Sequence, residues 1–258
     1  MKNFGGLDVR LTGGADGDGG GDETAVILLH GFGAPGDDLV PLSQALRVPK
    51  ETRFAFPAAP LKLDGGFGGR AWWMLDIEKF AADVASGRRH DTRIAPPGLS
   101  EAREKILAML EAMEAEWGLP PGGAFLGGFS QGAMLACDVA AQSARDFAGL
   151  IVMSGGITAE SEWETGWPAR AGLPVFQSHG SDDPLLAFDI AERLRDVLRG
   201  HGLRVEWRGV WGGGGDYREG GGGGGGVGVG AQPTGVAHGA LDKVLNHVVL
   251  RCLVAMHI

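Results

Sequence analysis

The residues best suited to chemistry are a serine and its flanking glycines at residues 128–132, in the order Gly-Phe-Ser-Gln-Gly. They follow an apolar run at residues 124–126 and precede a segment of helical character at residues 133–140. A serine with glycines two positions before and after it, between a strand and a helix, is the pattern of a nucleophile elbow. The turn is so sharp that only residues without a Cβ fit on either side. The pattern predicts Ser130 as a nucleophile; the alternative is a glycine-rich turn with an incidental serine.

A serine hydroxyl is a weak nucleophile that needs a neutral imidazole beside it and a carboxylate to orient that imidazole. In proteins with this elbow, the chain order is serine, then acid, then histidine. The loop at residues 179–184 follows a predicted strand and offers two acids, Asp182 and Asp183. We favour Asp183, because the following Pro184 restricts its backbone to an extended conformation.

Seven histidines are candidates for the base. Two of them, His30 and His179, precede glycine at strand ends, where shaping a loop is as plausible as chemistry. Only His238 both follows the last predicted strand and directly precedes the last predicted helix, where the base must lie, so we favour it. The others lie in a charged stretch, before the last strand, or within or beyond the final helix: His90, His201, His247 and His257.

Backbone amides and aromatic residues complete the predicted site. The glycine-bearing loop at residues 30–38 leaves a buried strand, which is a good place for an oxyanion donor. We predict the Phe32 N–H as one donor and the Gln131 N–H as the other. Trp72, Trp73 and Met74 follow a glycine-rich segment and are predicted to wall an apolar acyl pocket. The alternative for the tryptophans is an ordinary place in the core.

Strands alternate with helices along the chain, which predicts a mostly parallel sheet with helices on both faces. In such a sheet, reacting groups gather at the carboxyl ends of the strands, where the predicted site residues fall. The predicted strands cover residues 7–11, 24–29, 53–56, 124–126, 149–156, 174–178 and 203–207. The predicted helices are 39–46, capped by Asp37 or Asp38, 100–117, capped by Ser100, 133–140, one around 194–198, and 240–253.

Length and composition narrow the class of protein. A net charge of −9 argues against nucleic-acid binding. No apolar run approaches the ~20 residues that span a bilayer, and residues 1–6 have no apolar leader core. We read Cys137 and Cys252 as buried thiols, and we expect a cytoplasmic protein. Glycine tracts at about residues 13–22 and 212–230 are predicted to be flexible loops within one domain, residues 1–258.

Together these motifs resemble the phospholipase/carboxylesterase family of α/β-hydrolases, which includes the acyl-protein thioesterases. The resemblance implies the α/β-hydrolase fold, with Ser130 as nucleophile, Asp183 as acid, and the Phe32 and Gln131 amides as oxyanion hole. It also implies hydrolysis of short- to medium-chain ester or thioester bonds without a metal or cofactor. The resembling segments are residues 29–33 (LHGFG), 69–73 (GRAWW), 97–99 (PGL), 127–132 (GGFSQG), 154–156 (SGG) and 179–184 (HGSDDP).

The C-terminal part departs from the pattern of this family, in which a Gly-His follows soon after the last strand. Here Trp211 is followed by the second glycine tract, and His238 comes only after it. The sequence therefore predicts a serine hydrolase, with a catalytically impaired binding protein and an acyltransferase or peptidase on the same fold as alternatives. The short segment at residues 71–94 leaves little room for a cap domain and predicts an open site. The expected partner is a small acyl ester or thioester, and the oligomeric state is open, with a dimer as one option.

Overall fold

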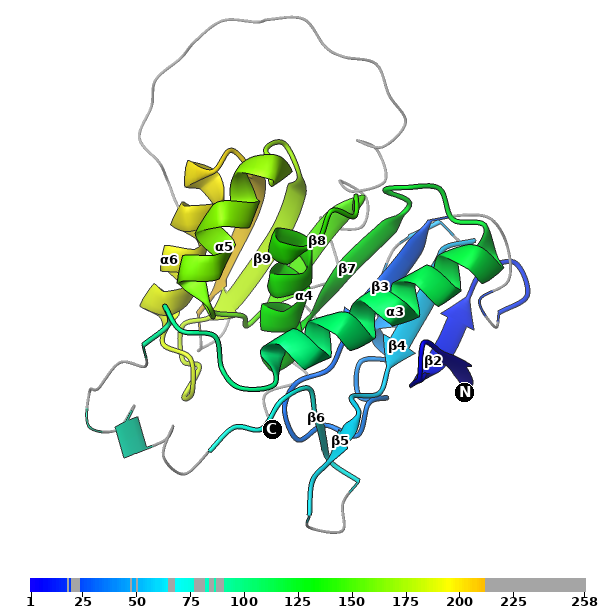
Figure 1. The fold of residues 1–258 in the computed structure, drawn as a ribbon, viewed down its shortest axis with the longest axis horizontal. Helices are drawn as coiled ribbons and strands as arrows, with labels where there is room; N and C mark the ends of the chain where they lie inside the picture. The colour runs from blue at the N-terminus through cyan, green and yellow to red at the C-terminus, as the bar shows by residue number, and fades with distance from the viewer. Residues whose placement is uncertain are drawn as a thin grey trace, which may run out of the picture.

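A computed structural model describes residues 1–17, 19, 24–46, 48–49, 51–64, 68–76, 82–83, 86 and 91–211. Its centre is an eight-stranded sheet in the order β1-β2-β4-β3-β7-β8-β9-β10 (Figure 1). The strands are β1 (Lys2–Phe4), β2 (Leu7–Gly13), β3 (Ala25–Leu29), β4 (Arg53–Pro57), β7 (Ala124–Phe129), β8 (Gly149–Met153), β9 (Pro174–Gly180) and β10 (Arg204–Val210). Two short strands, β5 (Leu61–Lys62) and β6 (Arg70–Ala71), form a separate antiparallel pair.

All neighbouring strands from β4 across to β10 are parallel, whereas β1 and β2 add an antiparallel edge. The inner parallel strands are buried on both faces, which explains continuous apolar runs such as the five residues of β3, whereas the edge strand β10 is only partly buried. The pairing aligns Ile27 with Leu126, Leu126 with Leu150, and Leu150 with Val175. These aligned side chains all belong to one buried cluster, so the strand register makes the core continuous from β3 to β9.

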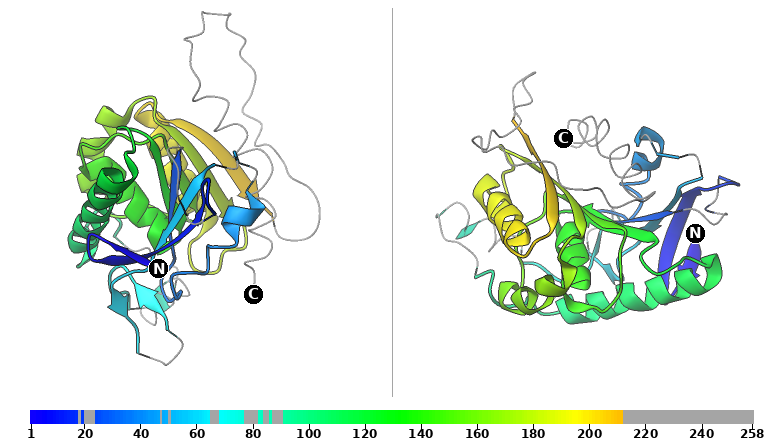
Figure 2. Two further views of the ribbon diagram at one scale, coloured as in Figure 1. Left: turned by 90° about the vertical axis from the view of Figure 1, so that its right-hand side faces the viewer. Right: turned by 90° about the horizontal axis from the view of Figure 1, so that it is seen from above.

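The helices divide between the two faces of the sheet. Figure 2 shows α3, α4, α5 and α6 on one side and the short α1 on the other. This division follows from right-handed crossovers, because the chain moves one way from β3 to β4 and the opposite way from β4 through β7 to β10. The helices are α1 (Leu42–Ala45), α3 (Leu99–Trp117), α4 (Gln131–Gln142), α5 (Glu160–Gly166), the 3₁₀ helix η1 (Trp167–Arg170) and α6 (Phe188–Gly200).

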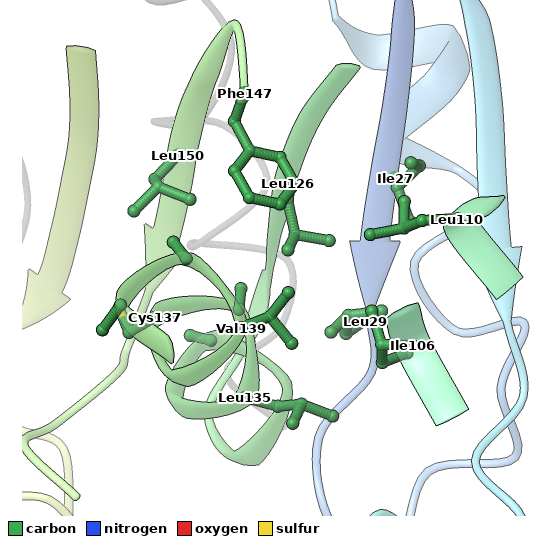
Figure 3. Packing of buried hydrophobic residues seen from close by; sticks show 14 of the residues in the cluster. Ile27, Leu29, Ile106, Leu110, Leu126, Leu135, Cys137, Val139, Phe147 and Leu150 are labelled. Atoms are coloured by element: carbon green, nitrogen blue, oxygen red, sulfur yellow. The ribbon is translucent and has the colours of Figure 1, made fainter. Parts of the chain in front are cut away.

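Each face of the sheet has its own buried apolar cluster. On the side of the long helices, Ile106 and Leu110 from α3 and Leu135 from α4 pack against β3 and β7 (Figure 3). The buried thiol of Cys137 lies in the same cluster, and burial raises its pKa to about 12, so it is an inert apolar group. Alternate residues of the same strands face the other side, where Val26, Leu28, Phe125 and Ile151 pack with Leu42 of α1 and with others.

Two predicted helix starts are wrong. Helix α3 begins at Leu99 after Gly98, which has a φ of 90°, and Ser100 makes no capping hydrogen bond. A turn sets this start: the Leu99 N–H donates to the Pro96 carbonyl at 3.2 Å, and the Ala102 N–H then donates to the Gly98 carbonyl at 3.0 Å. Helix α1 is only four residues long and starts after Pro41.

Neither acid predicted to cap α1 does so. The chain from residue 37 to residue 41 already forms a turn, in which the Val40 N–H donates to the Asp37 carbonyl at 3.1 Å. Pro41 then takes the N-cap position, with no side-chain hydrogen bond at the cap. Asp38 is half-buried instead, and burial raises the pKa of its carboxyl group.

Buried polar contacts fix α4 among its neighbours. Asp138 on α4 accepts hydrogen bonds from Arg103 of α3 and from the indole of Trp163 of α5, both at 2.8 Å. At the other end, Arg170 of η1 donates to the carbonyl of Ala140 at 2.7 Å and to that of Ser143. A cation at the C-terminus of a helix satisfies its last carbonyls and complements its dipole. These contacts fix the middle and the C-terminal end of α4.

The predicted strands are found, but some of them end elsewhere than predicted. Strand β8 ends at Met153 and not at residue 156, because Ser154 has a positive φ of 45°, which does not continue a strand. Strand β10 runs three residues further than predicted. The predicted helix at residues 240–253 and the glycine tract at 212–230 lie outside the described residues. In the first tract, the Gly19 N–H closes a turn on the Gly13 carbonyl at 2.8 Å, and the flexibility of the tract stays a prediction. No helix within the described ranges is long and apolar enough to cross a bilayer.

Candidate active site

The turn between β7 and α4 holds Ser130 in a conformation that is strained for a residue with a side chain, with φ 51° and ψ −115°. The two glycines around it are required by space. A Cβ on Gly128 would lie 2.4 Å from the carbonyl oxygen of Leu29, and a Cβ on Gly132 would lie 2.1 Å from the same atom. The predicted strand–turn–helix context is therefore confirmed, with Ser130 as the N-cap residue of α4.

Ser130 lies beside the loop that leaves β3. A Cβ on Gly31 would be only 3.5 Å from the Cβ of Ser130, and Phe32 follows directly and is half-buried. Strand β3 is the switch point of the sheet, since the chain goes from it to β4 on one side and reaches β7 on the other. Crevices at the carboxyl ends of strands at such a point are the usual binding sites of open α/β sheets.

The loop after β3 is tied down by a neighbouring segment. The Gly33 N–H donates to the carbonyl of Arg70 at 2.8 Å, and the Arg70 N–H donates to the carbonyl of Ala34 at 3.0 Å. The guanidinium of Arg70 donates in turn to the carbonyl of Ala59 at 2.8 Å. Gly69 allows this approach, because a Cβ there would lie 2.7 Å from the Gly33 carbonyl oxygen. The half-buried Phe32 thus precedes a loop whose backbone is fixed.

His30 shapes this loop. Its ring is buried, with Nδ1 2.8 Å from the carbonyl oxygen of Gly31 and Nε2 2.9 Å from the N–H of Ala59. A carbonyl can only accept and an N–H can only donate, so Nδ1 carries the proton and Nε2 does not. Burial lowers the pKa of His30, which keeps the ring neutral. These contacts fit a role of His30 in shaping the loop and not a role in the chemistry.

Asp183 has the more ordered carboxylate of the two candidate acids. Its Oδ1 accepts hydrogen bonds from the N–H groups of Leu185 at 3.0 Å and Leu186 at 2.9 Å. Asp182 is exposed and accepts a hydrogen bond from the hydroxyl of Ser181 at 2.9 Å. The loop follows β9, which is separated from β7 by β8 alone, so the acids and the elbow lie at the same edge of the sheet.

His179, in β9, contacts the loop that carries Asp183. Its side chain is fully buried, and Nε2 donates to the carbonyl of Leu186 at 2.8 Å. The same nitrogen lies 3.8 Å from Oδ2 of Asp183, and Nδ1 has no hydrogen-bond partner among the described residues. The ring meets the edge of Phe188 at 6.1 Å between centroids. His179 therefore links β9 to the loop that carries Asp183.

The three residues predicted to line a pocket lie in different surroundings. Trp72 and Trp73 are 2% and 1% exposed and belong to the main core, while Met74 is 60% exposed. Both tryptophans contact Gln131 through their backbones: the Trp72 N–H donates to Oε1 of Gln131 at 3.0 Å, and Nε2 of Gln131 donates to the Trp73 carbonyl at 2.8 Å. The Trp72 indole donates to the His30 carbonyl at 2.9 Å. The pocket role stays a prediction.

The bracing roles of Arg70 and of the Gln131 side chain are not predictable from the sequence. Their hydrogen bonds join segments far apart in the chain, which leaves no local spacing to detect. His238 and Cys252 lie outside the described residues, so the position of the predicted base is not part of the observed site. Within the described ranges, no three His, Cys, Asp or Glu residues come together as metal ligands.

Comparison with known proteins finds relatives of this chain. The profile of the Phospholipase/Carboxylesterase family matches residues 19–214. Acyl-protein thioesterase 1 of Eremothecium gossypii is 30% identical over 175 residues, which cover 66% of this chain and 70% of that protein. A probable carboxylesterase of Oryza sativa subsp. japonica is 28% identical over 189 residues, with 71% and 68% covered.

Solved structures have the same fold. The esterase PE8 superposes with a TM-score of 0.67 at 27% identity, over 80% of this chain and 90% of that one. A phospholipase/carboxylesterase from Dyadobacter fermentans superposes with a TM-score of 0.57 over 82% of this chain and 90% of its own, at 22% identity. The fold is that of the α/β-hydrolases, and the family is one of hydrolytic enzymes. With a family profile matched over most of its length, this chain belongs to the phospholipase/carboxylesterase family.

Proposed function

We propose that the protein is a serine hydrolase that cleaves ester or thioester bonds of short- to medium-chain acyl substrates through an acyl-enzyme. The observation that carries the proposal is the strained turn at Ser130, which lies at the N-terminus of α4 and beside the loop after β3. Strain of this kind is kept only where the surroundings enforce it, and it is typical of nucleophile elbows.

The reaction follows from the proposed roles. The hydroxyl oxygen of Ser130 attacks the acyl carbon while His238 takes the proton, and Asp183 holds the resulting imidazolium. The carbonyl electrons move onto oxygen, where the N–H groups of Phe32 and Gln131 stabilise the negative charge. Each such donor is typically worth ~3 kcal/mol of transition-state stabilisation. Collapse expels the alcohol or thiol with the proton from His238, and water repeats the sequence to release the acid.

The local structure supports these roles for Ser130, Gln131 and Asp183. The first N–H groups of a helix have no partner inside the helix and carry partial positive charge, so α4 favours an anion beside Ser130. With Oδ1 of Asp183 held by two backbone amides, its carboxylate has a fixed orientation within the loop after β9. None of the proposed steps requires a metal or a cofactor.

Chain-length preference is part of the proposal. Phe32 is half-buried beside the elbow, and Met74 is exposed after the buried tryptophan pair. Apolar side chains of this kind suit an acyl chain, and we include Trp72 and Trp73 in the proposed pocket. The expected partner is a small-molecule ester or thioester, and a cytoplasmic location, the single-domain organisation and the oligomeric state stay predictions.

The test is labelling with a fluorophosphonate, which reacts with an activated serine whatever the natural substrate is. We expect one labelled peptide, containing Ser130, and loss of both labelling and p-nitrophenyl ester turnover in Ser130→Ala. Ser154→Ala is the matched control, because Ser154 also follows a strand of the sheet and has a positive φ of 45°. Turnover that persists in Ser130→Ala would refute the proposal, whereas a folded wild type with neither labelling nor turnover would favour an impaired, ligand-binding hydrolase fold.

A further inference from the structure

The two proposed oxyanion donors come from different parts of the chain and must keep a fixed spacing. Phe32 belongs to the loop after β3, and Gln131 belongs to the first turn of α4. Oxyanion stabilisation requires both N–H groups at hydrogen-bond distance from one atom, and a misplacement of 1 Å can reduce the rate by about a hundredfold. Some contact must therefore hold the loop and the helix together.

Trp72 and Gln131 provide this contact. The carboxamide of Gln131 uses both its oxygen and its nitrogen on the backbone of residues 72 and 73, at 3.0 and 2.8 Å. The indole N–H of Trp72 then donates to the carbonyl of His30, 2.9 Å away, and the two rings lie 5.3 Å apart. The path runs from α4 through Trp72 to the residue that begins the oxyanion loop.

Burial makes this contact specific. Gln131 is 1% exposed and Trp72 is 2% exposed. A buried polar group that loses its partner destabilises its surroundings strongly, so groups with all partners in place hold one arrangement rather than several. The His30 carbonyl has little freedom, since a Cβ on Gly132 would lie 2.6 Å from its oxygen. A small shift of the loop would thus break a buried hydrogen bond.

We propose that the side chains of Trp72 and Gln131 are positioning residues that lock the loop after β3 against the start of α4, and so set the spacing of the oxyanion donors. The catalytic part of this inference rests on the proposed function, while the mechanical part concerns only the loop and the helix. The lock stabilises the tetrahedral transition state more than the bound substrate, because it acts on donors that are needed when the charge develops.

The deciding variant is Trp72→Phe, which keeps an aromatic ring in the core and removes the N–H that reaches His30. Its matched control is Trp163→Phe in a different part of the molecule. The indole N–H of Trp163 is equally buried and donates to Asp138 at 2.8 Å, and the substitution removes it. Both variants lose one buried hydrogen bond, so general destabilisation affects both. Only Trp72→Phe releases the loop.

Two readouts separate the mechanical and catalytic parts. Hydrogen–deuterium exchange of the peptide covering residues 30–36 should be faster by about tenfold in Trp72→Phe and unchanged in Trp163→Phe. In ester hydrolysis, kcat of Trp72→Phe should fall by about tenfold to a hundredfold with KM within about twofold. The inhibition constant of an alkyl boronic acid, which forms a tetrahedral adduct with the serine, should rise by the same factor as kcat falls.

Unchanged exchange of residues 30–36 in Trp72→Phe, or equal kcat in the two variants, would overturn the lock. If Trp72→Phe does not fold, Gln131→Glu takes its place, since it keeps the backbone amide and an acceptor for the Trp72 N–H but sets a carboxylate oxygen against the Trp73 carbonyl. The same two readouts then decide. A wild type without turnover or fluorophosphonate labelling would refute the proposed function alone, and the exchange measurement would still decide the lock.

Discussion

Ser130 and its glycine neighbours define the site at the scale of single residues. A strained φ at a residue with a side chain typically costs ~1–3 kcal/mol, and the packing of β3 against α4 must offset it. That packing leaves no room at Gly132, whose added Cβ would overlap the Leu29 carbonyl at 2.1 Å. The elbow is therefore a feature that the neighbouring strand enforces, and its sensitivity to substitution can be measured.

Gly132→Ala should lower the free energy of unfolding by about 3 kcal/mol or more, because strand β3 or helix α4 must move to admit the methyl group. Gly200→Ala is the control: a Cβ at Gly200, in the last turn of α6, meets nothing within 4 Å. There the substitution should be neutral or stabilise by up to about 1 kcal/mol. Chemical denaturation measures both, and equal stability of the two variants would contradict the packing argument.

His30 gives a prediction about pH. Burial lowers its pKa below 6.5, so the unfolded chain binds the proton more readily than the folded protein does. The stability contribution of His30 is therefore complete above about pH 6.5 and is lost as the pH falls below that value. Denaturation of the wild type and of His30→Gln, which does not titrate, should show a steeper loss of stability between about pH 7 and pH 5 for the wild type. Parallel curves would show that His30 is not held neutral.

The proposed catalytic groups lie in the loops between elements. In the loop after β9, substitutions can separate the role of Asp183 from that of its neighbour Asp182. The carboxylate of Asp183 is held by the amides of residues 185 and 186, whereas Asp182 is exposed. Asp183→Asn should therefore lower kcat by about 10⁴-fold, as loss of the orienting acid does in other triads. Asp182→Asn should change kcat little, and steady-state kinetics with a p-nitrophenyl ester compares them. The reverse order would assign the acid to Asp182.

At the scale of elements, what the sequence predicts depends on how local the cause is. Buried parallel strands appear in the sequence as apolar runs, and the elbow appears as a serine between Gly128 and Gly132. Both features are predictable because their sequence patterns are local. Helix α5 and η1 are not predicted, because their place depends on Trp163 and Arg170 contacting α4. The starts of α1 and α3 are mispredicted for a related reason: a turn already present before each helix replaces the expected side-chain cap.

In the whole molecule, the proposed base His238 follows the second glycine tract and lies outside the described residues. The entropic cost of closing a loop grows only logarithmically with its length, by ~0.6 kcal/mol per doubling. A long segment before the base is therefore compatible with a stable fold. We predict that replacing residues 212–230 by a short turn keeps or raises turnover. His238→Ala should lower turnover by at least ~10³-fold. Unchanged turnover in His238→Ala would assign the base to another histidine or to none.

If hydrolysis proceeds through an acyl group on Ser130, that acyl-enzyme can be trapped. The wild type is mixed with p-nitrophenyl butyrate, quenched with acid during turnover, digested and analysed by mass spectrometry, with Asp183→Asn in parallel to slow deacylation. We expect a butyryl group on the peptide that contains Ser130 and on no other peptide. Turnover without any acylated peptide, or with the acyl group on another residue, would contradict this mechanism.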